Sequence, residues 1–182
     1  VVFVVTLVNQ LKAAALFGGV FFLIFYPNLL AALRLSPDAA PPAATDFVPF
    51  PIPALGKRFL GVAILSVAVV MGVLMAVQGS TQWENLLRFA NATPFRLTDP
   101  LFERDISFYV FVLPVLRFAV SLLMTAVFLG GLAAVVTHYL YGGIRLTVRG
   151  LTVTRAARIH LAVLGAVFVL LMAVSYWLDR YS

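Results

Sequence analysis

The sequence predicts an all-α, polytopic integral membrane protein with four transmembrane helices and a short interfacial helix. Of its 182 residues, 63% are hydrophobic and 11% charged, against roughly 45–50% apolar and about 25% charged in soluble domains. Four stretches are also apolar for long enough to cross a hydrocarbon core of about 30 Å, which takes about 20 helical residues. The whole chain, 1–182, is therefore expected to form a single transmembrane domain.

The first span is predicted over about residues 12–34, and Lys12 and Arg34 mark its ends because long basic side chains reach the interface from there. Residues 36–56 hold six of the ten prolines. Each proline fixes φ and removes a hydrogen-bond donor, so this segment is predicted to be an extended linker, with a proline-motif docking site as the alternative.

The second and third spans, 59–77 and 114–140, each carry a stripe of small residues at every fourth position. Such stripes let helix backbones approach closely, and we expect the two stripes to pair with each other. The paired glycines Gly18–Gly19 and Gly130–Gly131 also indicate packing inside helices. The stripe residues are Ala68, Gly72 and Ala76 in one helix, and Ala126, Gly130 and Ala134 in the other.

A polar hairpin over 142–158 separates the third span from the fourth, which covers 160–178. Gly142 and Gly143 are expected to end the third helix, since glycine adopts the left-handed conformation of a helix C-terminus. The hairpin contains four arginines and no acid. Loops 35–58 and 142–158 are therefore placed on the cytoplasmic side of a bacterial inner membrane.

The segment 80–112 is expected to lie in the membrane interface. Ser80 or Thr81 could cap a short helix in which Glu84 pairs with Arg88. Asp99 suits the cap of the following turn, with Pro100 at its first position. An ionic cluster follows, made of Asp99, Glu103, Arg104, Asp105 and Arg117.

Two interpretations of this cluster compete. In the first, the ion pairs and caps fix how the third helix enters the membrane, and Arg117 pairs with Asp105 or Glu103. In the second, Glu103, Asp105 and Arg117 line a polar vestibule for ions or a small solute, because ionisable residues within membranes often mark pathways.

His138 and His160 flank the hairpin and could lie at similar depth, so they are the candidates for binding haem or a chlorin pigment. The alternative is a pair of interfacial histidines hydrogen-bonded to loop carbonyls. Without cysteine, thiolate nucleophiles and cysteine-ligated metals are excluded. No catalytic residues, metal site or cofactor are predicted, so the chain is not expected to be an enzyme.

Several segments in order, WENLLRFANATPFRLTDPLFERDISFYVF, LPVLRF, YLYGGIR, TRAARIHL and YWLDRYS, resemble the uncharacterised protein family 0182 of bacterial multi-pass membrane proteins. The first helix and the proline-rich linker match it only in character. The resemblance implies that this chain corresponds to part of a longer protein with further spans. It implies no activity, because none is established for the family.

The function expected from these observations is that of a non-catalytic, accessory transmembrane subunit of a larger membrane complex, such as a photosynthetic or respiratory one. Its partners would be the lipid bilayer and other membrane subunits. Nucleic acid is excluded, since no arginine- and lysine-rich run lies on a soluble element. A transporter or permease fragment is the first alternative, and a haem- or pigment-binding protein is the second.

Overall fold

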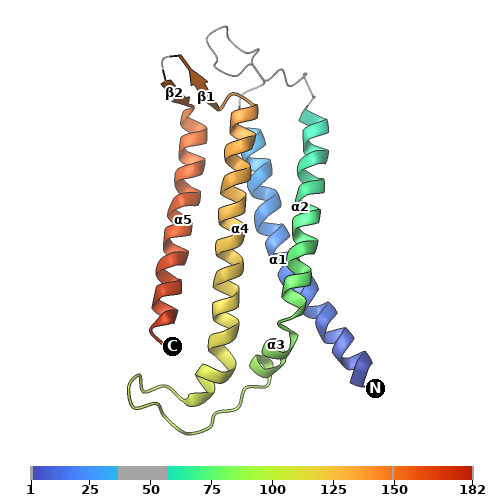
Figure 1. Cartoon of the computed structure of the whole chain (residues 1–182), viewed down its shortest axis with the longest axis vertical. Coiled ribbons are helices and arrows are strands. Elements are labelled where there is room, and N and C mark those ends of the chain that lie inside the picture. Colours follow the sequence, from blue (N-terminus) through green and yellow to red (C-terminus); the bar gives the residue numbers. More distant parts are fainter. Residues whose placement is uncertain (1, 37–56, 149, 182) are drawn as a thin grey trace. The chain divides into compact units, whose positions relative to one another are not determined.

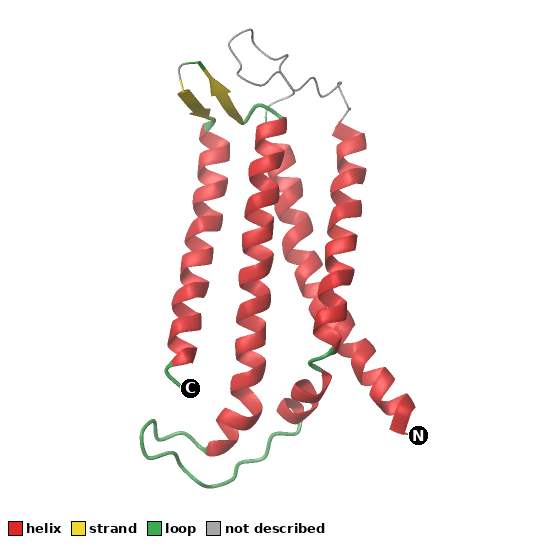
Figure 2. Ribbon diagram, in the orientation of Figure 1, coloured by secondary structure: helices red, strands yellow, loops and turns green. Residues whose placement is uncertain are grey.

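The computed structural model describes residues 2–36, 57–148 and 150–181. It is all-α except for one small antiparallel hairpin, which confirms the predicted fold class (Figures 1 and 2). The elements are α1 (Val2–Leu35), α2 (Lys57–Ser80), α3 (Trp83–Ala90), the π-helical turn η1 (Phe108–Val112), α4 (Leu113–Leu140), β1 (Ile144–Thr147), β2 (Gly150–Val153) and α5 (Arg155–Asp179).

Four of these helical stretches are long and apolar enough to cross a membrane. Each of the four predicted spans lies within one of them, and α1 also includes residues N-terminal to the first predicted span. The proline-rich linker, 36–56, lies outside the described residues except for Ser36.

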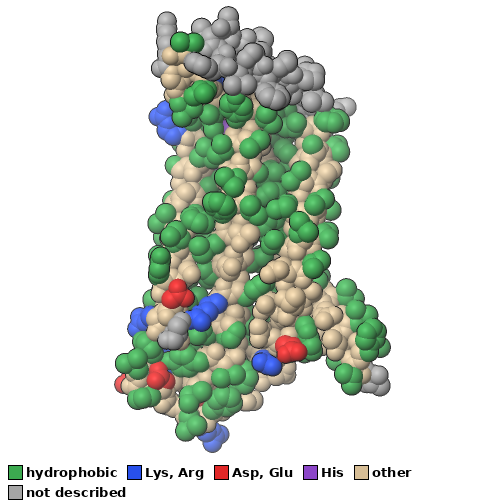
Figure 3. Space-filling view, viewed as in Figure 1, with side chains coloured by type: hydrophobic (Ala, Val, Ile, Leu, Met, Phe, Trp, Pro, Cys, Tyr) green, Lys and Arg blue, Asp and Glu red, His purple; other side chains and the backbone are tan. Residues whose placement is uncertain are grey.

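The chain forms two compact units, and each long helix contributes a segment to both. Unit 1 comprises Val1–Phe22, Met71–Thr125 and Leu170–Ser182, and unit 2 comprises Leu23–Val70 and Ala126–Val169. On the face of unit 1 drawn in Figure 3, acidic and basic side chains gather at the ends and loops of the helical segments, and the helices themselves present hydrophobic side chains. This distribution is the one that a hydrocarbon environment requires.

In unit 1, α1 and α2 pack closely through small residues. A Cβ added at Gly18 of α1 would lie 2.6 Å from the Cβ of Ala76 and 2.8 Å from the carbonyl oxygen of Gly72. One turn away, Gly79 lies against the ring of Phe17, which also meets Phe118 edge-on at 4.7 Å between centroids. Glycine is required at Gly18 because no side chain fits between the two backbones.

In unit 2, Gly130, the central residue of the small-residue stripe of α4, also packs against α1. A Cβ added at Gly130 of α4 would lie 2.5 Å from Nδ2 of Asn28, with Phe25 next nearest. The expected pairing of the two stripes was therefore wrong at both central glycines, since Gly72 and Gly130 each contact α1. Gly19 and Gly131, by contrast, have open space beside them.

The polar hairpin is shorter than predicted because α5 begins at Arg155. The side chain of Thr154 accepts a hydrogen bond from the backbone N–H of Ala157 at 3.3 Å, as an N-cap residue does. At the other end, Gly142 has φ +70° and Gly143 N–H donates to the carbonyl of His138 at 2.7 Å. The predicted glycine C-cap of α4 is therefore confirmed.

The predicted cap of the interfacial helix was wrong. Gln82 precedes α3 and makes no side-chain capping bond. Ser80 and Thr81 donate their hydroxyls to carbonyls of the preceding helix, those of Val77 and Gln78, so α2 uses both hydroxyls at its own C-terminus. The predicted ion pair from Glu84 to Arg88 is present at 3.2 Å.

Candidate functional site

A tight hairpin, residues 95–107, leads from α3 to η1 and carries most of the ionic cluster. Thr98 and Asp105 form an isolated antiparallel bridge, supported by the bond from Ile106 N–H to the Leu97 carbonyl at 2.9 Å. Glu103 takes a left-handed φ of 53° at the turn. The segment is therefore held by its own backbone and not only by its charged side chains.

Asp105 uses its carboxylate to hold the two arms of this hairpin together. Its oxygens accept hydrogen bonds from the backbone N–H groups of Phe95 at 3.1 Å, Arg96 at 2.8 Å and Ser107 at 2.8 Å. Arg96 has φ 58°, a conformation that lets successive N–H groups converge on one anion. Hydrogen bonds from the Ser107 side chain, then from backbone N–H groups, lower the pKa of Asp105 to about 2.

Asp99 caps the turn that follows it, as the sequence predicts. Its carboxylate accepts hydrogen bonds from the N–H groups of Leu101 and Phe102 at 3.3 and 3.2 Å, and from the hydroxyl of Tyr109 at 2.7 Å. The Tyr109 hydroxyl is the main cause of the lowered pKa of Asp99. Both aspartates of the hairpin are thus engaged, mainly by backbone N–H groups.

An aromatic cluster joins the hairpin to the end of α5 within unit 1. Tyr181 lies 5.0 Å from the ring of Phe102 and 5.3 Å from that of Phe108, between centroids, beside the buried Leu113 and Leu178. The Arg180 guanidinium lies over Phe102 at 5.3 Å, close enough for a cation–π contact. Neither the contact of Tyr109 with Tyr181 nor the bond from Tyr109 to Asp99 was predicted from the sequence.

Two arginines of the predicted ionic cluster contact groups other than its acids. Arg104 lies 5.6 Å above the ring of Phe108. The guanidinium of Arg117 donates to the carbonyl of Leu178 at 3.5 Å, whereas Asp105 is held by backbone N–H groups. The pairing of Arg117 with Asp105 or Glu103 stays a prediction.

We expect Asp105→Asn to open the hairpin, because an amide presents one oxygen where the carboxylate presents two. Hydrogen exchange at the Phe95, Arg96 and Ser107 amides should accelerate. The wild type should show the same opening at low pH: a lowered pKa means that the stabilisation is full above the ordinary value of 3.8 and is lost as the pH falls through about 2.

Glu103→Gln is the matched control for this substitution, since Glu103 is an exposed acid in the same turn. Its exchange pattern should equal that of the wild type. Equal acceleration in both variants would mean that net charge, and not the bonds to Asp105, holds the hairpin.

In unit 2, a chain of side-chain hydrogen bonds crosses α1, α4 and α5, and we call it the histidine chain. Its first bond joins Ser36 Oγ to Nδ1 of His138 at 2.8 Å. His138 Nε2 then meets Nδ1 of His160 at 3.2 Å, and His160 Nε2 meets Oδ1 of Asn28 at 2.9 Å. His138 is completely buried. The bonds of the histidine chain therefore give its ring nitrogens partners, without which burial of this polar side chain would cost free energy.

The two histidines are thus close, as the sequence suggested, but their partners are side chains and not loop carbonyls. Both nitrogens of each ring are engaged in the chain, so ligation of a haem or chlorin metal would first require breaking one of these bonds. Ser36 and Asn28 were missed in the sequence. A polar residue inside a predicted span was the signal that could have found Asn28, whereas Ser36 lies outside the predicted span.

The match to known families decides the identity of the chain. A family model described as an uncharacterised protein family, UPF0182, matches residues 1–182. The chain belongs to this family. No solved structure matches it.

Bacterial UPF0182 proteins show the extent of the likeness. The chain is 48% identical over 121 residues to one from Kocuria rhizophila, covering 66% of this chain and 12% of the relative. It is 39% identical to one from Paenarthrobacter aurescens, covering 93% and 16%, and 37% identical to one from Streptomyces coelicolor, covering 100% and 18%. The chain therefore spans less than a fifth of the length of these relatives.

Proposed function

We propose that this chain is a non-catalytic, structural transmembrane module that packs against other helices of a larger membrane protein or complex. The observation that carries the proposal is the use of Asp99 and Asp105. Their carboxylates accept hydrogen bonds from five backbone N–H groups and one tyrosine hydroxyl. A general base needs a pKa near the working pH, whereas the hydrogen bonds that hold the hairpin lower the pKa of both Asp99 and Asp105.

The apolar surfaces of α2 and α5 support the same proposal. Within their most hydrophobic windows, only 17% of α2 and 6% of α5 is buried. Valines along both helices are more than half exposed, including Val62, Val70, Val163 and Val169. Relatives of five times this length or more would have further helices to cover such surfaces.

Photocrosslinking from single positions tests this proposal. A crosslinking amino acid at Val70 of α2 or Val169 of α5 should give defined protein–protein products in membranes of the native host. The control position is Leu97, which is 62% exposed, as Val169 is, but lies in the hairpin outside the apolar helices. Products with lipid alone at both helix positions would contradict the proposal.

Substitution of Arg117 separates the structural role from transport. Arg117→Ala should impair folding or assembly, because it removes the hydrogen bond from the guanidinium on α4 to the Leu178 carbonyl at the end of α5. A stable, fully assembled variant with altered ion or solute flux would favour a vestibule at Glu103, Asp105 and Arg117 instead.

A further inference from the structure

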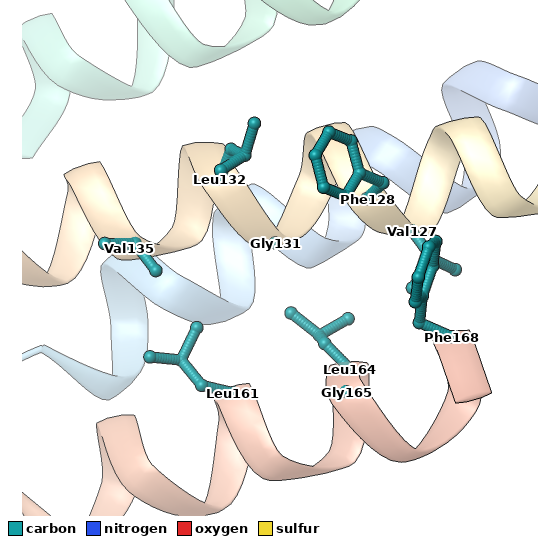
Figure 4. A pocket seen from close by; sticks show the side chains of 9 residues that line it. All are labelled: Val127, Phe128, Gly131, Leu132, Val135, Leu161, Leu164, Gly165 and Phe168. Atoms are coloured by element: carbon teal, nitrogen blue, oxygen red, sulfur yellow. The ribbon is translucent and has the colours of Figure 1, made fainter.

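An apolar groove runs between α4 and α5 within unit 2. Its volume is about 290 Å³ and every residue lining it is apolar. Figure 4 shows Val135 of α4 and Leu161 and Leu164 of α5 pointing into the space between the helices. The rings of Phe128 and Phe168, 5.9 Å apart, lie at one end.

Two glycines create this groove, one in each wall. Gly131 of α4 and Gly165 of α5 both line it, and a Cβ added at either position would meet nothing within 4 Å. These glycines therefore do not serve close helix packing, as Gly18 and Gly130 do. They leave a smooth apolar groove between the two helices.

A second, polar pocket of about 340 Å³ lies in the β1–β2 hairpin that connects these two helices in unit 2. Its lining includes Arg145, Thr152 and Thr154. The Arg145 guanidinium is held over Gly142, with Nε and Nη2 each 2.9 Å from where a Cβ would stand. The N-terminus of α5, which favours negative charge, begins beside this pocket at Arg155.

The charged side chains that the structure describes in unit 2 are all basic. Arg34, Arg145, Arg155 and Arg158 all belong to unit 2, and the described residues of that unit include no aspartate or glutamate. Among those residues, then, no carboxylate is available to neutralise Arg145. The pocket is suited to an anion, while the groove is suited to a hydrocarbon chain.

The spacing of the two sites matches one leaflet of a bilayer. Thr154 caps α5 and Phe168 lies within it, fourteen residues further along the chain. Fourteen residues correspond to about 21 Å of helix. Half of a bilayer, with its headgroups, is about 20–22 Å deep. A molecule with an anionic head in the pocket and an apolar tail in the groove would therefore fit the membrane depth of both.

From this geometry we infer that unit 2 binds an anionic phospholipid. The phosphate lies in the polar pocket against Arg145, and one acyl chain lies in the groove past Gly131 and Gly165. A helix from another subunit is a poorer occupant, because a ten-ångström length of helix about 10 Å wide needs roughly 800 Å³, well above the 290 Å³ of the groove.

Native mass spectrometry of the full chain in mild detergent tests this inference. Phosphatidylglycerol and phosphatidylcholine with identical acyl chains are offered, and phosphatidylglycerol should be retained preferentially. Arg145→Gln should reduce its retention about fivefold, the effect of about 1 kcal/mol per arginine near the surface, and leave phosphatidylcholine unchanged. Gly165→Leu should reduce the retention of both lipids, because the added side chain fills the groove.

Two matched variants serve as controls. Arg34→Gln removes an exposed arginine of unit 2 outside the pocket, and Gly61→Leu fills open space on α2. Both should retain lipid as the wild type does. A photoreactive acyl chain on phosphatidylglycerol should label α4 and α5 along the groove in the wild type, which tests the site even if a variant fails to fold.

Four results would overturn the inference. Equal retention of the two lipids would show that the pocket does not select an anion. Glycerol phosphate alone competing as strongly as the lipid would reduce the site to a phosphate pocket. Labelling spread evenly over all four long helices, or crosslinking of the groove to a second copy of the chain, would remove the acyl-chain site.

Discussion

Replacing Gly18 with alanine lowers the stability of the protein, and we expect this to be among the largest effects of any single methyl group in the chain. The new Cβ would lie 2.6 Å from Ala76 Cβ and 2.8 Å from the Gly72 carbonyl oxygen. Neither neighbour is the end of a flexible side chain, so α1 and α2 must separate. Overpacking of this kind costs about 1–3 kcal/mol, measurable as a lower thermal midpoint in detergent.

Gly19→Ala is the control for this substitution, because it changes the adjacent residue of the same helix where nothing lies within 4 Å. Alanine is also the better helix former, by about 1 kcal/mol. The Gly19 variant should therefore be as stable as the wild type or more so. If both variants lose the same stability, the close contact of α1 with α2 is not what the structure indicates.

His138→Leu should cause the second large loss of stability. Leucine fills much of the same volume, but Nδ1 of His160 loses its partner and Ser36 Oγ keeps only its bond to the Ala32 carbonyl. Each buried polar group left without a hydrogen bond costs about 1–3 kcal/mol. Unfolding midpoints in a graded series of denaturing detergent would measure the effect.

A double-mutant cycle separates the bond from the change in packing. Ser36→Ala alone should also destabilise, and the double variant should lose less than the sum of the two single losses. Thr137→Val is the matched control: Thr137 is buried beside His138, but its hydroxyl donates only to Ala133 within its own helix. Strict additivity of the two single losses would show that the Ser36–His138 bond does not contribute.

The fold class was predictable because the surrounding solvent determines it. In hydrocarbon every backbone polar group must be satisfied internally, so uncharged stretches of this length form helices. The caps at Asp99 and Gly142 were predictable because each acts on neighbouring residues. The cap expected from Ser80 or Thr81 was not, because both hydroxyls bond to carbonyls of α2.

Partner choice was not predictable from the same patterns. A small-residue stripe shows that a helix face is smooth, but it does not name the helix that covers it, and both stripes meet α1 at their central glycines. Asp105 was expected to form ion pairs, yet its partners include N–H groups nine and ten residues away. Those contacts depend on the left-handed turn at Arg96, which no spacing of residue types indicates.

The π-helical turn η1 determines the direction in which the hairpin leaves α4. Leu113 N–H bonds to the Phe108 carbonyl, five residues back, and Pro114 follows, which lacks an N–H and would crowd the carbonyl four residues before it. Such a turn holds one residue more than an α-helical turn, and each helical residue represents about 100° of rotation. Deleting one residue here would rotate Asp99 and Tyr109 around the helix axis and away from Tyr181. The length of this turn therefore sets the angle about the α4 axis at which the hairpin meets the end of α5.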